Sequence, residues 1–205
     1  VNSSTDQLLE LVGQGNRKYI RNAVEAAHAA RSWAKSTAHL RAQILYYIAE
    51  NLSVRREEFA ERIAEMTGAA MESAKAEVDL SIDRLFMYAA WADKYDGAAH
   101  GVPIRGLALA MHEPVGIIGM LCSDQAPLLG MVSVLAPAIA MGNTCVIVPS
   151  QAYPLMATDF YQVLETSDLP AGVVNIVTAA HSDVVETMAG HMEVDPLWYC
   201  AADGH

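Results

Sequence analysis

The sequence predicts an α/β fold in which a layer of helices precedes a doubly wound parallel sheet. Apolar residues recur every three to four positions from Asn16 to about Asp96, and the period then changes near Tyr95. From Val115 onward, short apolar runs alternate with helical segments. The length of 205 residues suits one domain with a helical extension. Because 53% of the residues are apolar, we expect the chain to fold around a substantial core.

The first half of the chain is predicted to form about four helices. Ser36 or Thr37 is a suitable N-cap for the second helix. Ser53, with Glu57 close behind, is the expected N-cap of the third helix, and Gly68 is expected to end it. Three sets of residues show the spacing of a buried helix face: Ile20, Val24, Ala27 and Ala30; Leu40, Ile44, Ile48 and Leu52; and Val78, Ile82, Leu85 and Ala89. Four methionines are expected on apolar faces as core filler: Met66, Met71, Met87 and Met141.

The second half is predicted to form a parallel sheet. The stretch "YDGAAHGVP" breaks the helical pattern, and an edge strand or hairpin is expected before a buried strand from Val115 to Cys122. Helices are then expected at 127–141, 154–165 and 182–189, and strands at 145–148, 173–177 and 197–200. Short apolar strands joined by helices form right-handed βαβ units, with helices on both faces of the sheet. Such sheets bind ligands where strands turn into helices, so the turns should carry the function.

Charge and hydropathy exclude two classes of partner. The chain has 13 Lys and Arg against 24 Asp and Glu, a formal charge of −11, which opposes binding to nucleic acid. The longest near-apolar run, Leu128 to Met141, contains Pro137 and is too short to cross a bilayer. The first residues also lack the basic start and long apolar stretch of a signal peptide. We therefore expect neither a nucleic-acid partner nor a membrane partner.

The cysteines and histidines show no metal-binding pattern. Cys122, Cys145 and Cys200 are far apart and odd in number, without CxxC spacing, and the seven histidines show no HxxxH or HExxH spacing. No metal site is expected, and a reducing cytosol fits this cysteine usage. Each cysteine is expected to act as a small buried hydrophobe, with Cys122 the one to test for reactivity. His181, at a strand-end turn, is a candidate ligand contact or else a structural residue.

Dinucleotide-binding sheets usually show a GxGxxG turn, whose glycines let the backbone approach the pyrophosphate. That motif is absent from this sequence. The run "GIIG" at 116–119 lies inside the first predicted strand, where glycine is expected to allow tight strand packing.

Several phrases together resemble the aldehyde dehydrogenase superfamily. The order "HEPVGIIG", "PLL", "LAPAIAMGNTCVIVPSQAYPL", "DLPAGVVNIVT" and "HMEVDPLWY" resembles its cofactor domain. The phrases "AVEAAHAARSWA", "RAQILYYIAENL" and "AEVDLSIDRLFMYAAWADKYDG" resemble its leading helices. The resemblance runs from about Gly15 to the last residue. It implies a helical segment at 1–98 and part of a Rossmann-like cofactor-type domain at 99–205, incomplete relative to the family.

The resemblance implies oxidation of aldehydes to carboxylic acids with NAD or NADP. In the family a cysteine thiolate attacks the carbonyl, hydride passes to the nicotinamide, and a glutamate-activated water releases the acid. An asparagine amide and a backbone N–H stabilise the oxyanion. That asparagine lies in a Pro-Trp-Asn-Phe-Pro turn, which is matched here by Ser123-Asp124-Gln125-Ala126-Pro127. Gln125 therefore stands at the oxyanion position with one methylene too many, and Asp124 adds a negative charge beside it.

The other turns also depart from the family's pattern. Its Lys-Pro-Ala/Ser-Glu turn, which holds the adenosine ribose, is matched by Val148-Pro149-Ser150-Gln151, so the lysine and the carboxylate are both replaced. The glycine-rich turn after the third strand is matched by residues that include Ala179 and Ala180. The family's Phe-Thr-Gly-Ser-Thr turn, which opens a helix under the pyrophosphate, is matched by Tyr199-Cys200-Ala201-Ala202-Asp203. Asp203 would place a carboxylate near phosphate, at a cost of about 1 kcal/mol or more.

Two hypotheses follow from these differences between the turns and the family's pattern. One is a non-catalytic domain fragment kept for folding or assembly, with no tightly bound cofactor, and most similar to the degenerate second domain of a tandem (family sixteen type) aldehyde dehydrogenase. The alternative is the N-terminal part of an active NAD(P)-dependent enzyme, because the family's catalytic cysteine and glutamate lie in sequence beyond His205. Family dimers use a hairpin from this region, matched here by "VPIRGLALAMHEP". A homo-oligomer, or pairing with another aldehyde dehydrogenase domain, is therefore expected.

Overall fold

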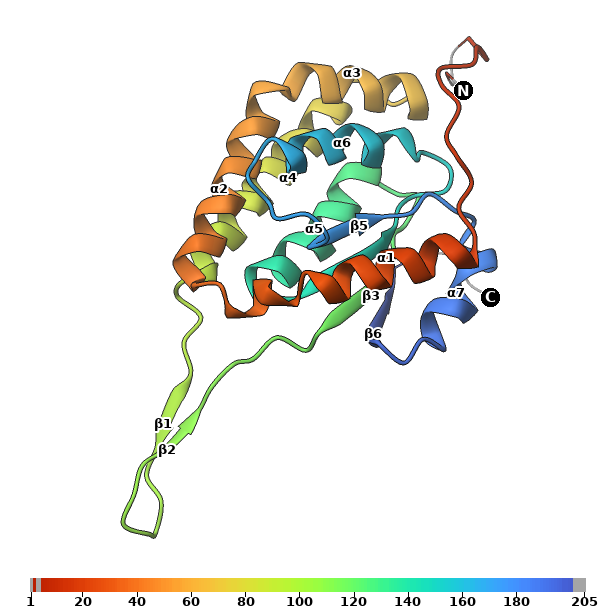
Figure 1. The fold of residues 1–205 in the computed structure, drawn as a ribbon. Helices are drawn as coiled ribbons and strands as arrows, with labels where there is room; N and C mark the ends of the chain where they lie inside the picture. The colour runs from red at the N-terminus through yellow and green to blue at the C-terminus, as the bar shows by residue number, and fades with distance from the viewer. Residues whose placement is uncertain (1, 3–4, 201–205) are drawn as a thin grey trace.

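The structure is a computed structural model that describes residue 2 and residues 5–200. Its first part is helical, as the apolar spacing predicts. The helical elements in this part are α1 (Arg17–Ala29), a short 3₁₀ turn η1 (Arg31–Lys35), α2 (Ala38–Val54), α3 (Arg56–Thr67) and α4 (Met71–Ala92) (Figure 1).

Short polar side chains and one glycine set the helix boundaries. Thr37 accepts a hydrogen bond from the Leu40 amide at 3.1 Å and so caps α2, and Gly68 ends α3 in the left-handed conformation with φ 74°. The prediction that Ser53 caps the third helix is wrong. Ser53 lies inside α2, where its hydroxyl donates to the carbonyl of Ala49 at 2.8 Å, and Arg55 separates the two helices.

A hairpin and a four-stranded sheet follow α4. The hairpin strands β1 (Ala98–His100) and β2 (Ala108–Ala110) pair antiparallel and form an arm that projects from the body of the molecule (Figure 1). The sheet strands are β3 (Ile117–Leu121), β4 (Thr144–Val148), β5 (Val174–Ile176) and β6 (Val194–Tyr199). The connecting helices are α5 (Pro127–Ala140), α6 (Leu155–Glu165) and α7 (His181–Ala189).

The sheet is parallel, with strand order β5-β4-β3-β6. The chain runs outward from β3 to β5 and then crosses back to place β6 on the other side of β3. The winding therefore reverses between β3 and β6, which defines the switch point of a doubly wound sheet. The carboxyl ends are level there, because Leu121 is in register with both Val148 and Tyr199.

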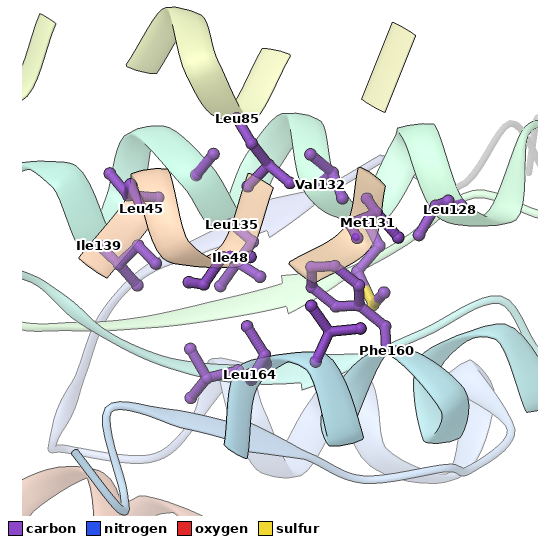
Figure 2. Close-up of a cluster of buried hydrophobic side chains, with 14 of the residues drawn as sticks. Leu45, Ile48, Leu85, Leu128, Met131, Val132, Leu135, Ile139, Phe160 and Leu164 are labelled. Atoms are coloured by element: carbon purple, nitrogen blue, oxygen red, sulfur yellow. The ribbon is translucent and has the colours of Figure 1, made fainter. Parts of the chain in front are cut away.

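Helices cover both faces of the sheet. Helices α5 and α6 lie on one face, with α2 and α4 packed over α5, and Figure 2 shows leucine, isoleucine and phenylalanine side chains of these helices meeting in one buried cluster. Helices α1 and α7 cover the opposite face, where Ile20 and Val24 contact the sheet residues Val146 and Val148. The first helix of the N-terminal segment thus packs on the sheet, whereas α2 to α4 form the outer layer expected of that segment.

Three residues predicted to lie on buried helix faces are exposed. Leu40 is 43% exposed, because residues spaced strictly by four advance 400° per step and drift around a helix of 3.6 residues per turn. Leu45 lies in the core instead. Met71 and Met87 are 39% and 44% exposed, since Met71 begins α4 and Met87 lies on its outer side.

Glycine in β3 allows close packing, as the sequence predicts. A Cβ at Gly119 would lie 2.9 Å from both Leu197 Cδ1 of β6 and Met188 Cε of α7. The absent side chain therefore leaves room for the ends of the Leu197 and Met188 side chains against β3. Among the described residues, no helix is long and apolar enough to span a membrane.

Candidate functional site

The candidate site is the edge of the sheet where the four strands end. In a doubly wound sheet this edge, and above all the crevice at the switch point, is where ligands bind. The turn 123–126 follows β3, the turn 149–154 follows β4 and the turn 177–180 follows β5. The turn after β6 begins at Cys200, so Ala201, Ala202 and Asp203, predicted to face the pyrophosphate, lie outside the described residues.

The first turn is tight and ends in an unusual backbone conformation. Ala126 has φ 49° and ψ 70°, in the left-handed region that a residue with a Cβ rarely adopts, and Pro127 then begins α5. Gln125 is exposed at this turn, and its backbone amide donates to the Ser123 hydroxyl at 3.0 Å. Its side chain thus lies at the surface beside the switch point, and its predicted match to the family's oxyanion asparagine stays a prediction.

Glu77 of α4 holds the start of α5 in place. One carboxylate oxygen accepts from the amides of Leu128 and Leu129, at 2.9 and 3.2 Å. These are donors that a helix leaves unpaired in its first turn. Burial raises the pKa of Glu77, and the two backbone hydrogen bonds oppose this rise. Sequence reasoning missed this residue, although an acidic residue three positions after the buried Ala74 on an apolar helix face was a usable signal.

Asp124 joins the first turn to the second. Its Oδ1 accepts from the Ser150 hydroxyl at 2.6 Å and from the Ala152 amide at 3.1 Å. The Ser150 oxygen in turn accepts from the Tyr153 amide at 2.9 Å, and Ser150 is only 1% exposed. The polar groups of the second turn are therefore bound to the protein itself.

Val148 and Gln151, predicted to match the family's ribose-binding pair, have structural contacts. Val148 is fully buried in the cluster beneath α1 and α7. The Gln151 side-chain carbonyl accepts from the backbone amide of His181 at 2.9 Å, so it caps the first turn of α7. The oxygen that could have accepted from a ribose hydroxyl therefore already has a donor.

His181 is a buried member of the same edge. It is 5% exposed, and its Nε2 lies 3.0 Å from the carbonyl oxygen of Pro149, a geometry in which Nε2–H donates. Nδ1 is buried with no hydrogen-bond partner among the described residues. The Tyr199 ring stands edge-on to the imidazole at 6.4 Å between ring centroids. His181 thereby ties α7 to the turn after β4.

The third turn is partly covered by the N-terminal segment. The Gly15 amide donates to the carbonyl of Thr178 at 2.6 Å, and the Thr178 hydroxyl donates to the carbonyl of Gly13 at 2.6 Å. Ala179 is 8% exposed and packs in the core, and Ala180 precedes α7 in an extended conformation. A cavity of about 270 Å³ remains between this turn, Gln151 and residues 12–14.

The three cysteines differ in exposure. Cys122 and Cys145 are buried, as predicted, but Cys200 is exposed, because it follows the last strand at the open edge of the sheet. Burial, and secondarily the neighbouring Cys200 thiol, raises the pKa of Cys122 to about 12. Its thiol therefore stays protonated near neutral pH, which argues against Cys122 as the residue that reacts first with an external reagent. No set of three His, Cys, Asp or Glu side chains within the described ranges could hold a metal ion.

These observations define a class of protein: an α/β chain built on the Rossmann-like architecture of dinucleotide-binding domains. The comparison with protein families is more specific. The aldehyde dehydrogenase family model matches residues 1–198. The chain therefore belongs to the aldehyde dehydrogenase family and corresponds to its N-terminal region.

Known relatives agree with this assignment. The chain is 31% identical over 201 residues to an aldehyde dehydrogenase of Agaricus bisporus, covering 96% of this chain and 40% of the relative. It is 33% identical over 204 residues to the mitochondrial aldehyde dehydrogenase of Rattus norvegicus, covering 96% and 39%. Betaine aldehyde dehydrogenase of Staphylococcus aureus, solved in complex with NAD+, superposes with a TM-score of 0.93 at 28% identity, over 97% of this chain and 40% of that one. The chain spans about 40% of the length of these relatives.

Proposed function

We propose that this chain is a non-catalytic aldehyde dehydrogenase-type domain whose cofactor turns have been converted into structural contacts. Its role is then in folding and assembly, and NAD binding is absent or no tighter than millimolar. Within the family, we propose that it corresponds to the N-terminal half of a degenerate second domain of the tandem type. The conservation of the fold alongside the altered turns supports this proposal.

The observation that carries the proposal is the hydrogen bonding along the edge of the sheet. Asp124 bonds to Ser150 and Ala152, and Gln151 bonds to the His181 amide. A nucleotide that bound here would have to share or displace these bonds, and each displaced bond costs roughly 1 kcal/mol. It would also bring its phosphates toward the Asp124 carboxylate, where like charges repel.

The distribution of charge points the same way. Residues 106–205 contain ten Asp and Glu and no Lys or Arg, so this half of the chain carries a formal charge of −10. A pyrophosphate is itself negatively charged, and binding sites for it supply cations or free backbone amides. The sheet half supplies no cation, so its long-range field repels a dinucleotide.

The thiols within this chain are poorly suited to act as the nucleophile. Two of the three thiols are buried, and burial raises the pKa of Cys145 as well as that of Cys122. A protonated, inaccessible thiol does not attack an aldehyde carbonyl. Cys200 is the accessible thiol, and it stands at a threonine position of the family's pattern.

The projecting arm supports a role in assembly. Its side chains Ile104, Leu107 and Leu109 are 74%, 72% and 60% exposed. Apolar groups exposed on an extended arm are stabilised by burial against a partner. We propose a second copy of this chain or another aldehyde dehydrogenase domain as that partner, in a reducing compartment such as the cytosol, and neither nucleic acid nor membrane.

The alternative proposal is the N-terminal part of an active NAD(P)-dependent enzyme. The named activities of the relatives favour it, as does the close superposition on a betaine aldehyde dehydrogenase in complex with NAD+. In that case the nucleophile and the general base lie in sequence that follows this chain. A cysteine in a Gly-Gln-x-Cys setting within that sequence would favour this alternative.

An activity assay tests whether the chain by itself holds a complete set of catalytic groups. The purified chain, incubated with NAD and propanal or benzaldehyde, is expected to form no NADH above a protein-free control. Turnover that persists in the Cys122→Ala and Cys200→Ala variants would contradict the proposal that the catalytic parts are missing. Turnover abolished by one of these two changes would also contradict it, and would identify a new nucleophile.

A further inference from the structure

Cys122 and Cys200 each directly follow one of two neighbouring strands, β3 and β6. Leu121 and Tyr199 are register partners in the parallel pair β3–β6, and the Cys200 amide continues the ladder by donating to the carbonyl of Leu121 at 2.9 Å. The residues that follow, Cys122 and Cys200, are therefore adjacent across the two strands. Neighbouring strands are about 4.8 Å apart, which falls within the range of about 4.4–6.8 Å between the Cα atoms of a disulfide.

Both thiols point to the same face of the sheet. Met120 and Trp198 are register partners, and both contribute to the core on the α5 face. Side chains alternate along a strand, so residues two positions further on point to that face again. Cys122 indeed belongs to the same core cluster.

The two thiols differ in solvent exposure, so only one of them can meet an oxidant from solution. Cys200 is exposed, whereas Cys122 is 1% exposed directly behind it. We propose that Cys122 and Cys200 form a dithiol oxidation site that reacts with hydroperoxides and closes into an intramolecular disulfide at the switch point. No step of aldehyde oxidation uses these two residues, so the inference is independent of the proposed function.

The reaction balances in two steps. The Cys200 thiolate attacks the terminal oxygen of the hydroperoxide, an S–O bond forms as the O–O bond breaks, and the other oxygen leaves as an alcohol or water after taking up a proton. The Cys122 sulfur then attacks Cys200 Sγ, an S–S bond forms as the S–O bond breaks, and the hydroxyl leaves with the Cys122 proton as water. The two sulfurs each lose one electron, and the peroxide gains both.

Cys145 provides a matched control. It is a buried cysteine of the same sheet, but its register partner on β3 is Ile118, four residues before Cys122. That separation along the strands is roughly 13 Å. A disulfide from Cys122 to Cys145 is therefore not expected, although Cys145 lies in the same core cluster.

The test is mass spectrometry of the folded chain after treatment with hydrogen peroxide. Remaining thiols are blocked with N-ethylmaleimide in denaturant, and the chain is cut after Asp and Glu, because no Lys or Arg lies between the two cysteines. We expect a mass loss of about 2 Da before blocking, one blocked thiol, and a linked peptide pair containing Cys122 and Cys200. The Cys145→Ala variant should give the same linked pair.

The single variants make the assignment falsifiable. In Cys122→Ala, the oxidised Cys200 has no partner, so dimedone should trap it as a sulfenic acid in place of the disulfide. In Cys200→Ala, Cys122 should remain a free thiol under the same treatment. A linked pair that includes Cys145, a Cys200–Cys200 dimer on a non-reducing gel, or over-oxidation of Cys200 beside an unreacted Cys122 in the parent chain would each overturn the proposal.

Discussion

At the scale of single residues, a few polar side chains decide what the edge of the sheet can bind. Asp124 stands where the family has an aromatic residue, and it bonds to the adjoining turn instead of leaving the turn open. Gln151 keeps a polar group at the ribose position, but its carbonyl caps α7. The same chemistry that would have recognised a ligand therefore stabilises the protein.

Glu77 gives a prediction about stability. Replacing Glu77 with Ala removes the acceptor of two helix amides and should lower the free energy of unfolding by about 1–2 kcal/mol. Glu77→Gln keeps an acceptor oxygen without the charge and should change stability by less than about 0.5 kcal/mol. Urea unfolding at neutral pH measures both variants. If both variants lose the same unfolding free energy, the negative charge of Glu77, and not its acceptor oxygen, stabilises the start of α5.

The pH dependence of the same variants tests the raised pKa of Glu77. Because the pKa is higher in the folded state, the folded chain binds this proton more tightly than the unfolded chain does. The resulting stabilisation is present below the ordinary pKa of glutamate and is lost as the pH rises through the raised value. Between the ordinary pKa of glutamate and the raised pKa of Glu77, the stability of the parent should decline as the pH rises. Glu77→Gln should remove this decline. If the stability of Glu77→Gln declines with rising pH as much as that of the parent, Glu77 is not the cause of the decline.

At the scale of elements, how well the sequence predicts a feature depends on how local that feature is. Thr37 and Gly68 act within one turn of their own helices, so the sequence predicts those boundaries correctly. The bond from Asp124 to Ser150 spans 26 positions, and that from Glu77 to Leu128 spans 51. Such contacts depend on strand register and helix packing, which apolar spacing alone does not specify. Ser53 was misassigned because its hydroxyl can bond back into a continuing helix as readily as it can cap a new one.

The contact between β3, β6 and α7 gives a prediction at this scale. Gly119→Ala places a Cβ 2.9 Å from the side-chain ends of Leu197 and Met188, which must shift, so we expect a loss of about 1 kcal/mol of unfolding free energy from overpacking. Gly106→Ala is the matched control, because a Cβ there meets nothing within 4 Å. Thermal unfolding followed by circular dichroism measures both. A Gly119→Ala variant as stable as the control would show that β3 and α7 are not as closely packed as described.

At the scale of the whole molecule, the fold of the family is retained, and we propose that the chemistry of its edge has changed. The strand order, both helical layers and the projecting arm are present, and the chain superposes on a solved betaine aldehyde dehydrogenase with a TM-score of 0.93. The core depends on apolar side chains that are far more numerous than the few polar groups of the turns. Those few groups, together with the absence of Lys and Arg after Arg105, set the expected affinity for a dinucleotide.

A restored variant tests whether the altered turns are the cause. Val148→Lys, Gln151→Glu, Ala201→Gly and Ala202→Ser together reinstate the family's residues, and the fourfold variant should bind NAD more tightly than the parent. Val148 is fully buried, so circular dichroism must first show that the variant remains folded. No gain in affinity in a folded variant would mean that the turns themselves have moved.

The most direct test of the central claim is isothermal titration calorimetry of the unmodified chain with NAD. The account predicts no heat beyond dilution, or a dissociation constant no tighter than about 1 mM, which corresponds to about 4 kcal/mol of binding free energy. A dissociation constant in the low micromolar range would contradict it. That result would mean that the bonds of Asp124 and Gln151 yield to the cofactor, and that the chain is the cofactor-binding part of an active enzyme.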